Sequence, residues 1–179
     1  MGQEFETQVL EVNPKEIAEK LRNLGAKEEK EYLQKRWVFD IEKTPKNEAW
    51  IRLREAKGKA AITYKNKKGT GTSETEEIEF TVENFDKAAE VLSKIKGFSG
   101  KYYQENKRHK FVLNEIEFTL DTWPKIPAIL EIEAQSEEKV KQGLKLLELE
   151  GKEEGHIGLK AIYKKYGIDL HSYKEIKFE

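Results

Sequence analysis

Residues 4–10 read EFETQVL, in which charged or polar side chains alternate with apolar ones. In an extended strand, residues two apart point to the same face. Glu4, Glu6 and Gln8 therefore share one face, while Phe5 and Val9 share the other. Neighbouring like charges on one sheet face repel each other. A strand built in this way raises the question of what offsets the repulsion between its carboxylates.

The same alternation recurs along the chain and predicts further half-buried strands. The segments are AWIRLRE (49–55), AITYKNK (61–67), EEIEFTV (76–82), NKRHKFVL (106–113), EIEFTLDTW (115–123) and AILEIEA (128–134), with another strand over 34–40. The charges are sorted by strand, with acidic pairs at 4/6, 77/79 and 131/133 and a basic pair at 52/54. Because an ordinary solvated face intersperses the two signs, this sorting favours a functional lining.

Three helical patterns and one short helix lie between or after these strands. Asn13 is the expected N-cap of the first, with Pro14 at its first position, Glu16 completing a capping box and Gly25 ending it. The apolar stripes expected to face inward are Ile17, Leu21 and Leu24, then Val91, Leu92 and Ile95 (helix 84–96), then Val140, Leu144 and Leu147 (helix 136–149), with a short helix in 156–167. Together these elements predict an α+β fold in which an antiparallel sheet or barrel carries a few helices.

Composition limits the classes of function. The 179 residues suit a single domain over 1–179, and the absence of cysteine excludes disulfides and thiolate metal sites. The 33 basic and 34 acidic residues give a net charge of −1, so nucleic acid is not an expected partner. Neither a membrane-spanning apolar run nor a signal peptide is apparent, so we expect a cytoplasmic protein, either a monomer or a homodimer.

A charged sheet face has two interpretations. It is an outer, solvated face, as in a structural adaptor, or it lines the interior of a curled sheet. An interior that contains both signs must hold a charged ligand, because unpaired buried charges are costly. A polyphosphate with a divalent cation has the right chemistry. Guanidinium forks match phosphate oxygens, and carboxylates suit Mg²⁺ or Mn²⁺; the candidates are Arg52, Arg54, Arg108 and Lys65 for phosphate, and Glu4, Glu6, Asp121, Glu131 and Glu133 for the metal.

The ordered set of these short motifs resembles the CYTH superfamily, or triphosphate tunnel metalloenzymes, and is most similar to its cyclase-like prokaryotic branch. The motifs are Glu4-x-Glu6, Arg52-x-Arg54, Thr63-Tyr64-Lys65, Glu77-x-Glu79, Arg108, Asp121 and Leu130-Glu131-Ile132-Glu133. The resemblance implies a closed antiparallel eight-stranded β-barrel with flanking helices, whose tunnel binds a metal–triphosphate. It implies catalytic roles for Glu4, Glu6, Lys65 and Glu133, and triphosphate contacts from Gln8, Arg52, Arg54, Lys65, Lys67, Glu79 and Arg108.

One residue departs from the family signature Glu-x-Glu-x-Lys, because Gln8 stands where the lysine belongs. An amide donates a hydrogen bond but carries no charge, so electrostatic stabilisation of the transition state should be weaker. The predicted function is a metal-dependent enzyme that hydrolyses an inorganic or organic triphosphate. The alternatives are a class IV adenylyl cyclase that makes cyclic AMP and pyrophosphate from ATP, and a triphosphate-binding protein without turnover. His109, His156 and His171 lack metal-ligand spacing and are expected to be ordinary histidines.

Overall fold

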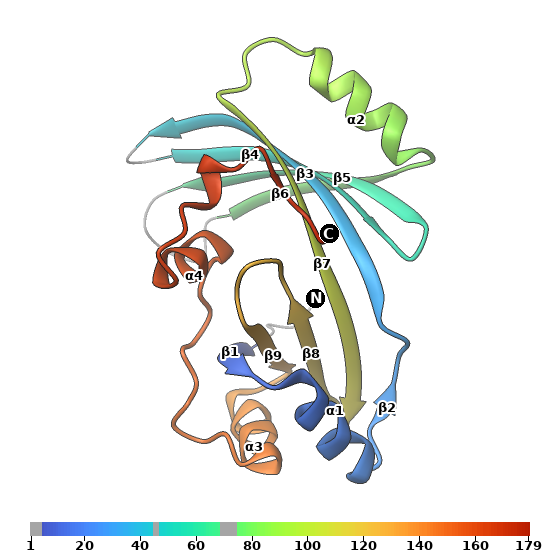
Figure 1. The fold of residues 1–179 in the computed structure, drawn as a ribbon, viewed down its shortest axis with the longest axis vertical. Coiled ribbons are helices and arrows are strands. Elements are labelled where there is room, and N and C mark those ends of the chain that lie inside the picture. The colour runs from blue at the N-terminus through green and yellow to red at the C-terminus, as the bar shows by residue number, and fades with distance from the viewer. Residues whose placement is uncertain (1–4, 45–46, 69–74) are drawn as a thin grey trace. The chain divides into compact units, whose positions relative to one another are not determined.

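The computed structural model of the chain describes residues 5–44, 47–68 and 75–179 (Figure 1). The chain divides into two compact units. Unit 1 takes the described residues of Met1–Tyr32 and Asn106–Leu170, and unit 2 takes those of Leu33–Glu105 and His171–Glu179. Both units pack helices on an antiparallel sheet, so the α+β class is confirmed. One domain over residues 1–179 stays a prediction.

Unit 1 contains four long strand segments and three helices. Their bounds are β1 Phe5–Val12, α1 Pro14–Asn23, β2 Lys27–Glu28, β8 Ile116–Thr122, β9 Ala128–Ala134, α3 Glu137–Leu147 and α4 Leu159–Lys165, together with the part of β7 (Gly100–Leu113) that begins at Asn106. Strand β9 lies between β1 and β8, and β8 pairs with β7, all in antiparallel register. The short strand β2 pairs with β7 on its other side.

The core of unit 1 lies between one face of this sheet and helices α1 and α3. Its buried apolar residues are Val9, Ile17, Ala18, Leu21, Phe111, Ile116, Phe118, Leu120, Leu130, Ile132, Ala134, Val140, Leu144, Leu147 and Leu149. The expected inward residues of helix α3 are therefore confirmed. In α1, Ile17 and Leu21 are buried as expected, but Leu24 is the C-cap residue and is exposed.

The helix starts in unit 1 follow from local hydrogen bonding. The Asn13 side chain accepts a hydrogen bond from the Lys15 backbone N–H at 3.1 Å, and Pro14 takes the first helical position. Glu16 bonds to the Asn13 side-chain amide at 2.8 Å, a variation on the expected capping box. In α3, Ser136 caps the Lys139 N–H at 3.3 Å. These polar caps fix where each apolar stripe begins.

Unit 2 contains a meander of four strands and one long helix. Their bounds are β3 Tyr32–Thr44, β4 Asn47–Ala56, β5 Lys59–Lys68, β6 Thr75–Val82 and α2 Phe85–Lys94, with the first part of β7, the short 3₁₀ helix η1 Leu170–Ser172 and β10 Glu175–Ile176; the first residues of β3 and η1, Tyr32 and Leu170, belong to unit 1. Strands β3 to β6 pair in sequence order and β10 pairs with β7 in parallel. Helix α2 covers one face of this meander (Figure 1).

The inward face of helix α2 differs from the expectation. The buried residues are Phe85, Ala89 and Leu92, which pack on Phe39 and Leu53 of the sheet. Val91 is 64% exposed and Ile95 is 45% exposed, so the prediction that both face inward was wrong. The spacing i, i+4, i+7 of Phe85, Ala89 and Leu92 forms one helical face, and Val91 lies off it.

The expected closed eight-stranded barrel was also wrong. Over the described residues, the sheet has ten strands, and its order β1-β9-β8-β7-β3-β4-β5-β6 is an open path with β1 and β6 at its ends. The outer edge of β1 is occupied, because Gln8 N–H donates to the Gly155 carbonyl at 3.0 Å and Gln8 O accepts from Glu154 N–H at 2.8 Å. Val9 also forms an antiparallel bridge with Glu153. Backbone groups already used in this way cannot close a barrel at that edge.

Across the described residues, the helices are too short or too polar to cross a membrane.

Candidate functional site

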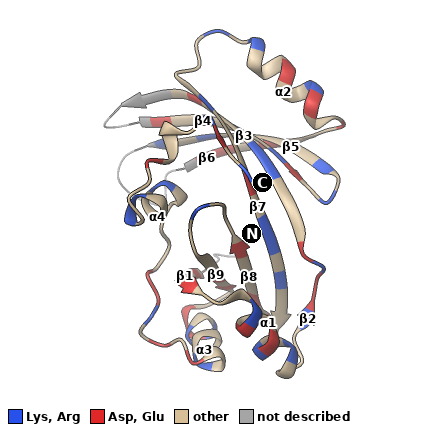
Figure 2. Ribbon diagram, viewed as in Figure 1, with Lys and Arg blue, Asp and Glu red and all other residues tan. Residues whose placement is uncertain are grey.

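One face of the unit 1 sheet collects charged and polar side chains from four strands. Glu6 lies opposite Glu133 and Gln8 opposite Glu131 across β1 and β9. The members of this face, here called the charged face of unit 1, are Glu6, Gln8, Arg108, Lys110, Glu117, Thr119, Asp121, Glu131 and Glu133. Lys and Arg recur along β7, whereas Asp and Glu mark β1 and β8 (Figure 2). The alternation seen in the sequence therefore does gather those predicted residues of unit 1 that the structure describes on one surface.

Three carboxylates stand in a row across this face. Glu6 of β1 lies opposite Glu133 of β9, and Glu133 lies opposite Glu117 of β8. Like charges at directly opposite positions destabilise a sheet. Lys110 forms an ion pair with Glu117 at one end of the row. The crowding of acidic groups at the other end favours binding of a cation there.

Arg108 and Asp121 form a two-point ion pair in the same face. Arg108 donates from Nε to Asp121 Oδ1 at 2.9 Å and from Nη2 to Oδ2 at 2.5 Å. Asn106 Nδ2 donates to the same Oδ1 at 2.8 Å. Burial disfavours the charge on Arg108, but the Asp121 carboxylate raises the pKa of its guanidinium. Asp121 thereby holds a permanently charged, planar group in a fixed orientation.

Glu131 lies between this ion pair and strand β1. Its carboxylate accepts a hydrogen bond from Gln8 Nε2 at 3.2 Å, and Arg108 Nη2 lies 3.9 Å from its other oxygen. Burial raises the pKa of Glu131 despite the opposing effects of Arg108 and Gln8, and the nearby Glu6 charge raises it further. A bound cation would favour the charged form of this carboxylate.

His156 completes a candidate metal-binding group. Its Nδ1 lies 2.9 Å from Glu6 Oε1, and this hydrogen bond lowers the pKa of Glu6 although burial opposes the shift. One ligand atom from each of Glu6, Glu131 and His156 lies within 4.8 Å of the others. Two carboxylates and an imidazole at this spacing have the donor chemistry of a divalent cation site.

His156 is a candidate site residue that the sequence pattern did not predict. It is separated from Glu6 by most of the chain and has no neighbouring metal-ligand motif, so it was expected to be an ordinary histidine. Its position depends on the segment Glu153–Ile157, which lies along the outer edge of β1. No local periodicity encodes such a long-range backbone contact.

Unit 2 has a charged face of its own, formed by side chains of β4, β5 and β6. Its predicted site residues are Arg52, Arg54, Lys65, Lys67 and Glu79. Arg52 Nη2 donates to Thr63 Oγ1 at 3.4 Å and lies 3.9 Å from Glu79. Thr63 in turn donates to Glu79 at 2.6 Å, and Lys65 pairs with Glu77 at 2.8 Å. On this face, acidic side chains of strand β6 therefore hold the basic side chains of Arg52 and Lys65 in place.

The predicted site residues thus fall on two faces. Unit 1 brings together Glu6, Gln8, Arg108, Asp121, Glu131 and Glu133. Unit 2 brings together Arg52, Arg54, Lys65, Lys67 and Glu79. Glu4 lies outside the described residues. The catalytic, phosphate-binding and metal-binding roles given to these residues stay predictions.

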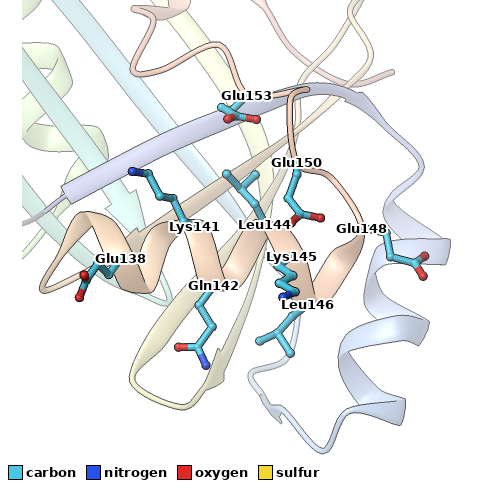
Figure 3. Close-up of a pocket in the computed structure, with 9 residues that line it drawn as sticks. All are labelled: Glu138, Lys141, Gln142, Leu144, Lys145, Leu146, Glu148, Glu150 and Glu153. Carbon is cyan, nitrogen blue, oxygen red and sulfur yellow. The ribbon is translucent and has the colours of Figure 1, made fainter.

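A hollow with a volume of about 950 Å³ lies along helix α3 (Figure 3). Its lining residues are Glu138, Lys141, Gln142, Leu144, Lys145, Leu146, Glu148, Glu150 and Glu153. None of the predicted site residues is among them. Acidic and basic side chains alternate along this helix surface, as is common on a solvated face.

A family model described as the CYTH domain matches residues 3–163. The match spans nearly the whole chain, so the protein belongs to the CYTH domain family. A search among curated proteins found no match.

Several solved structures share the fold. The PH1012 protein from Pyrococcus horikoshii OT3 is 26% identical, with a TM-score of 0.66 over 87% of this chain and 96% of that chain. A candidate adenylate cyclase from Vibrio parahaemolyticus is 17% identical, with a TM-score of 0.65 over 92% and 99%. HpAC1 from Hippeastrum, a candidate adenylyl cyclase with a dominant triphosphatase activity, is 18% identical, with a TM-score of 0.56 over 92% and 96%.

Proposed function

We propose that this member of the CYTH domain family is a metal-dependent enzyme that hydrolyses an inorganic or organic triphosphate. The observation that carries the proposal is the row of carboxylates at Glu6, Glu133 and Glu117 beside the fixed guanidinium of Arg108. Within one unit, such a face offers carboxylate oxygens as ligands for a cation and guanidinium N–H groups as hydrogen-bond donors for a polyanion. Family membership and the resemblance of the ordered motifs give independent support.

The proposed metal is Mg²⁺ or Mn²⁺, held by Glu6, Glu131 and Glu133, with Glu4 as a further ligand from the sequence pattern. A divalent cation would offset the negative charge of the phosphates and lower the pKa of a bound water. Both Asp121 oxygens accept hydrogen bonds, which favours a positioning role for Asp121 over its predicted ligand role. Burial keeps water from weakening the contact between Asp121 and Arg108.

The phosphate contacts proposed for the chain are guanidinium and ammonium groups. In unit 1, Arg108 is oriented by Asp121 and retains further N–H donors for phosphate oxygens. In unit 2, Arg52 and Lys65 are oriented by Glu79 and Glu77. Arg54 and Lys67 are further proposed contacts from the resemblance, whereas the Glu79 carboxylate would act on the triphosphate only by orienting Arg52. In a hydrolase, guanidinium and ammonium groups orient the triphosphate and stabilise charge on its oxygens while water attacks the terminal phosphorus.

Phosphate release from tripolyphosphate, ATP and thiamine triphosphate with Mg²⁺ or Mn²⁺ tests the proposal. We expect Glu131→Gln and Arg108→Ala each to lower kcat/KM by at least about a hundredfold, which corresponds to about 2.7 kcal/mol of transition-state stabilisation. Glu148→Gln, which removes an exposed carboxylate near the end of α3, is the matched control and should leave the rate unchanged. Equal rates in all variants would refute the assignment. Cyclic AMP and pyrophosphate formed from ATP in equal amounts would identify a cyclase instead.

A second candidate, triphosphate binding without turnover, is favoured by one residue. Gln8 is buried, and its side-chain amide forms hydrogen bonds with Glu131 and with the Ile157 backbone N–H. Because an amide is neutral, this position supplies no positive charge to a triphosphate. Triphosphate-dependent thermal stabilisation without phosphate release would support this candidate. Gln8→Lys should then raise turnover measured with Mg²⁺ by restoring the charge of the family signature, whereas an unchanged rate would make that charge irrelevant.

A further inference from the structure

We propose that His156 is a nitrogen ligand of the cation bound by Glu6 and Glu131, and that it makes the site selective for a divalent transition metal over Mg²⁺. The ligand atoms of the three residues lie within 4.8 Å of one another, and they come from β1, β9 and the segment after α3. The inference rests on the proposed metal dependence and deepens it, because it assigns a ligand and a metal preference.

The position of His156 is fixed by backbone contacts of its neighbours. Gln8 exchanges hydrogen bonds with Glu154 and Gly155 on the outer edge of β1, at 2.8 and 3.0 Å. The Ile157 N–H donates to Gln8 Oε1 at 2.9 Å, so residues on both sides of His156 are held. A loop fixed on both sides presents its imidazole to Glu6 with little loss of conformational entropy on metal binding.

Gln8 explains why this chain can hold the loop. Its side chain acts in both directions, donating from Nε2 to Glu131 and accepting at Oε1 from Ile157. The lysine of the family signature has three donors and no acceptor, so it could not bind the Ile157 N–H. The departure at position 8 and the position of His156 are therefore parts of one arrangement, in which a lysine charge is exchanged for an imidazole ligand.

The chemistry of the donor set determines the metal preference. Mg²⁺ prefers oxygen ligands in octahedral geometry, whereas imidazole nitrogen raises the affinity for later first-row metals such as Co²⁺, Ni²⁺ and Zn²⁺. Unit 1 contains a second histidine–glutamate pair, His109 and Glu28, which serves as a comparison because other groups neutralise its carboxylate. His109 Nε2 lies 2.8 Å from Glu28, but Glu28 also accepts two hydrogen bonds from Arg22, which neutralises it. Glu6 instead neighbours Glu131 and Glu133, which increase its need for a cation.

Titration calorimetry with Co²⁺ alone and with Mg²⁺ alone, without any phosphate compound, tests the inference. We expect His156→Ala to weaken Co²⁺ binding by at least about tenfold while Mg²⁺ binding changes less than about threefold. The visible absorption of bound Co²⁺ should also change, because one nitrogen ligand is lost. His109→Ala is the matched control and should leave both affinities and the spectrum unchanged. Gln8→Lys should weaken Co²⁺ binding as His156→Ala does, because it releases the loop.

Equal losses for Co²⁺ and Mg²⁺ in His156→Ala, or an unchanged Co²⁺ spectrum, would overturn the inference. His156 would then be only a hydrogen-bond partner of Glu6. These measurements are independent of turnover, so failure of the hydrolase proposal leaves them interpretable. Conversely, if His156→Ala still hydrolyses triphosphate and binds Co²⁺ with unchanged affinity, the ligand role of His156 is overturned while the hydrolase proposal stands.

Discussion

The charged faces of the two units arise from the same sequence pattern but differ in burial. In unit 1 the acidic partner of the arginine, Asp121, has a side chain only 9% exposed. In unit 2 the acidic partners Glu77 and Glu79 are each 43% exposed. Glu77 and Glu79 lie on β6, an end strand of the sheet, whereas Asp121 lies on β8 between two paired neighbours. Position in the sheet therefore decides how strongly a charge pair is shielded from water.

This difference separates two kinds of charged surface. A half-exposed ion pair gains little, because water screens both partners. A buried pair has lost its hydration, so each partner depends strongly on the other. We expect unit 1 to be sensitive to single charge removals and unit 2 to tolerate them.

The largest expected effect is the loss of Asp121. Asp121→Ala leaves the mostly buried Arg108 guanidinium without its two-point partner and should lower the free energy of unfolding by about 3 kcal/mol. Glu77→Ala removes the half-exposed partner of Lys65 and should cost less than about 1 kcal/mol. Urea denaturation at pH 7 measures both values. Equal costs would show that burial does not distinguish the two faces.

In each unit a helix packs on the sheet, α3 in unit 1 and α2 in unit 2. We expect the substitution chosen in α3 to cost more stability than the one chosen in α2. A Cβ added at Gly143 of α3 would lie 2.9 Å from Ile132 Cγ2, so Gly143→Ala should destabilise unit 1 by about 1–3 kcal/mol through overpacking. Val91→Ala removes an exposed side chain from α2 and should change stability by less than about 0.5 kcal/mol. Thermal unfolding of the two variants compares them directly, and a greater cost at Val91 would contradict the inward face observed for α2.

The smallest effects, opposite in sign, are expected at two carboxylates of the charged face of unit 1. Burial raises the pKa of Glu131, so its charged form destabilises the fold above that pKa, and the penalty disappears as pH falls. The His156 hydrogen bond lowers the pKa of Glu6, so its contribution is present above the ordinary value of 4.5 and is lost as pH falls through the lowered pKa.

Metal-free protein, kept so with a chelator, makes this contrast measurable. Glu131→Gln should stabilise the protein at pH 7 and Glu6→Gln should destabilise it, with both differences shrinking toward pH 3. Urea denaturation across this range gives the values. The same sign for both variants at pH 7 would mean that His156 does not stabilise the Glu6 carboxylate.

Much of the local structure could be predicted from the sequence. Alternation of period two assigned the faces of β1, β8 and β9, and the cap residues Asn13 and Ser136 mark helix starts in the structure. These features depend on neighbouring residues alone, since side-chain direction and capping are set within a few positions of the chain. Val91 shows where prediction from the pattern fails. It is adjacent to Leu92 in helix α2, and of the two only Leu92 is buried against the sheet.

Long-range contacts could not be predicted in this way. Alternation states which side chains share a face but not whether the last strand meets the first, and here the segment Glu153–Gly155 occupies the edge of β1 instead. His156 entered the candidate site through the same contact. The sequence shows that Gln8 lacks the charge of the signature lysine and can donate a hydrogen bond, but its role in accepting from the Ile157 N–H depends on the tertiary structure.

The sequence by itself determined the α+β class, the strand faces and the family to which the chain belongs, because these follow from periodicity and an ordered set of charged residues. Only the tertiary structure decided that the sheet is open, that Asp121 is shielded while Glu77 is not, and that His156 lies beside Glu6. The physical reason is that pairing at a strand edge and burial of a charge depend on which distant segment lies there, and the period of a single strand carries no information about that segment.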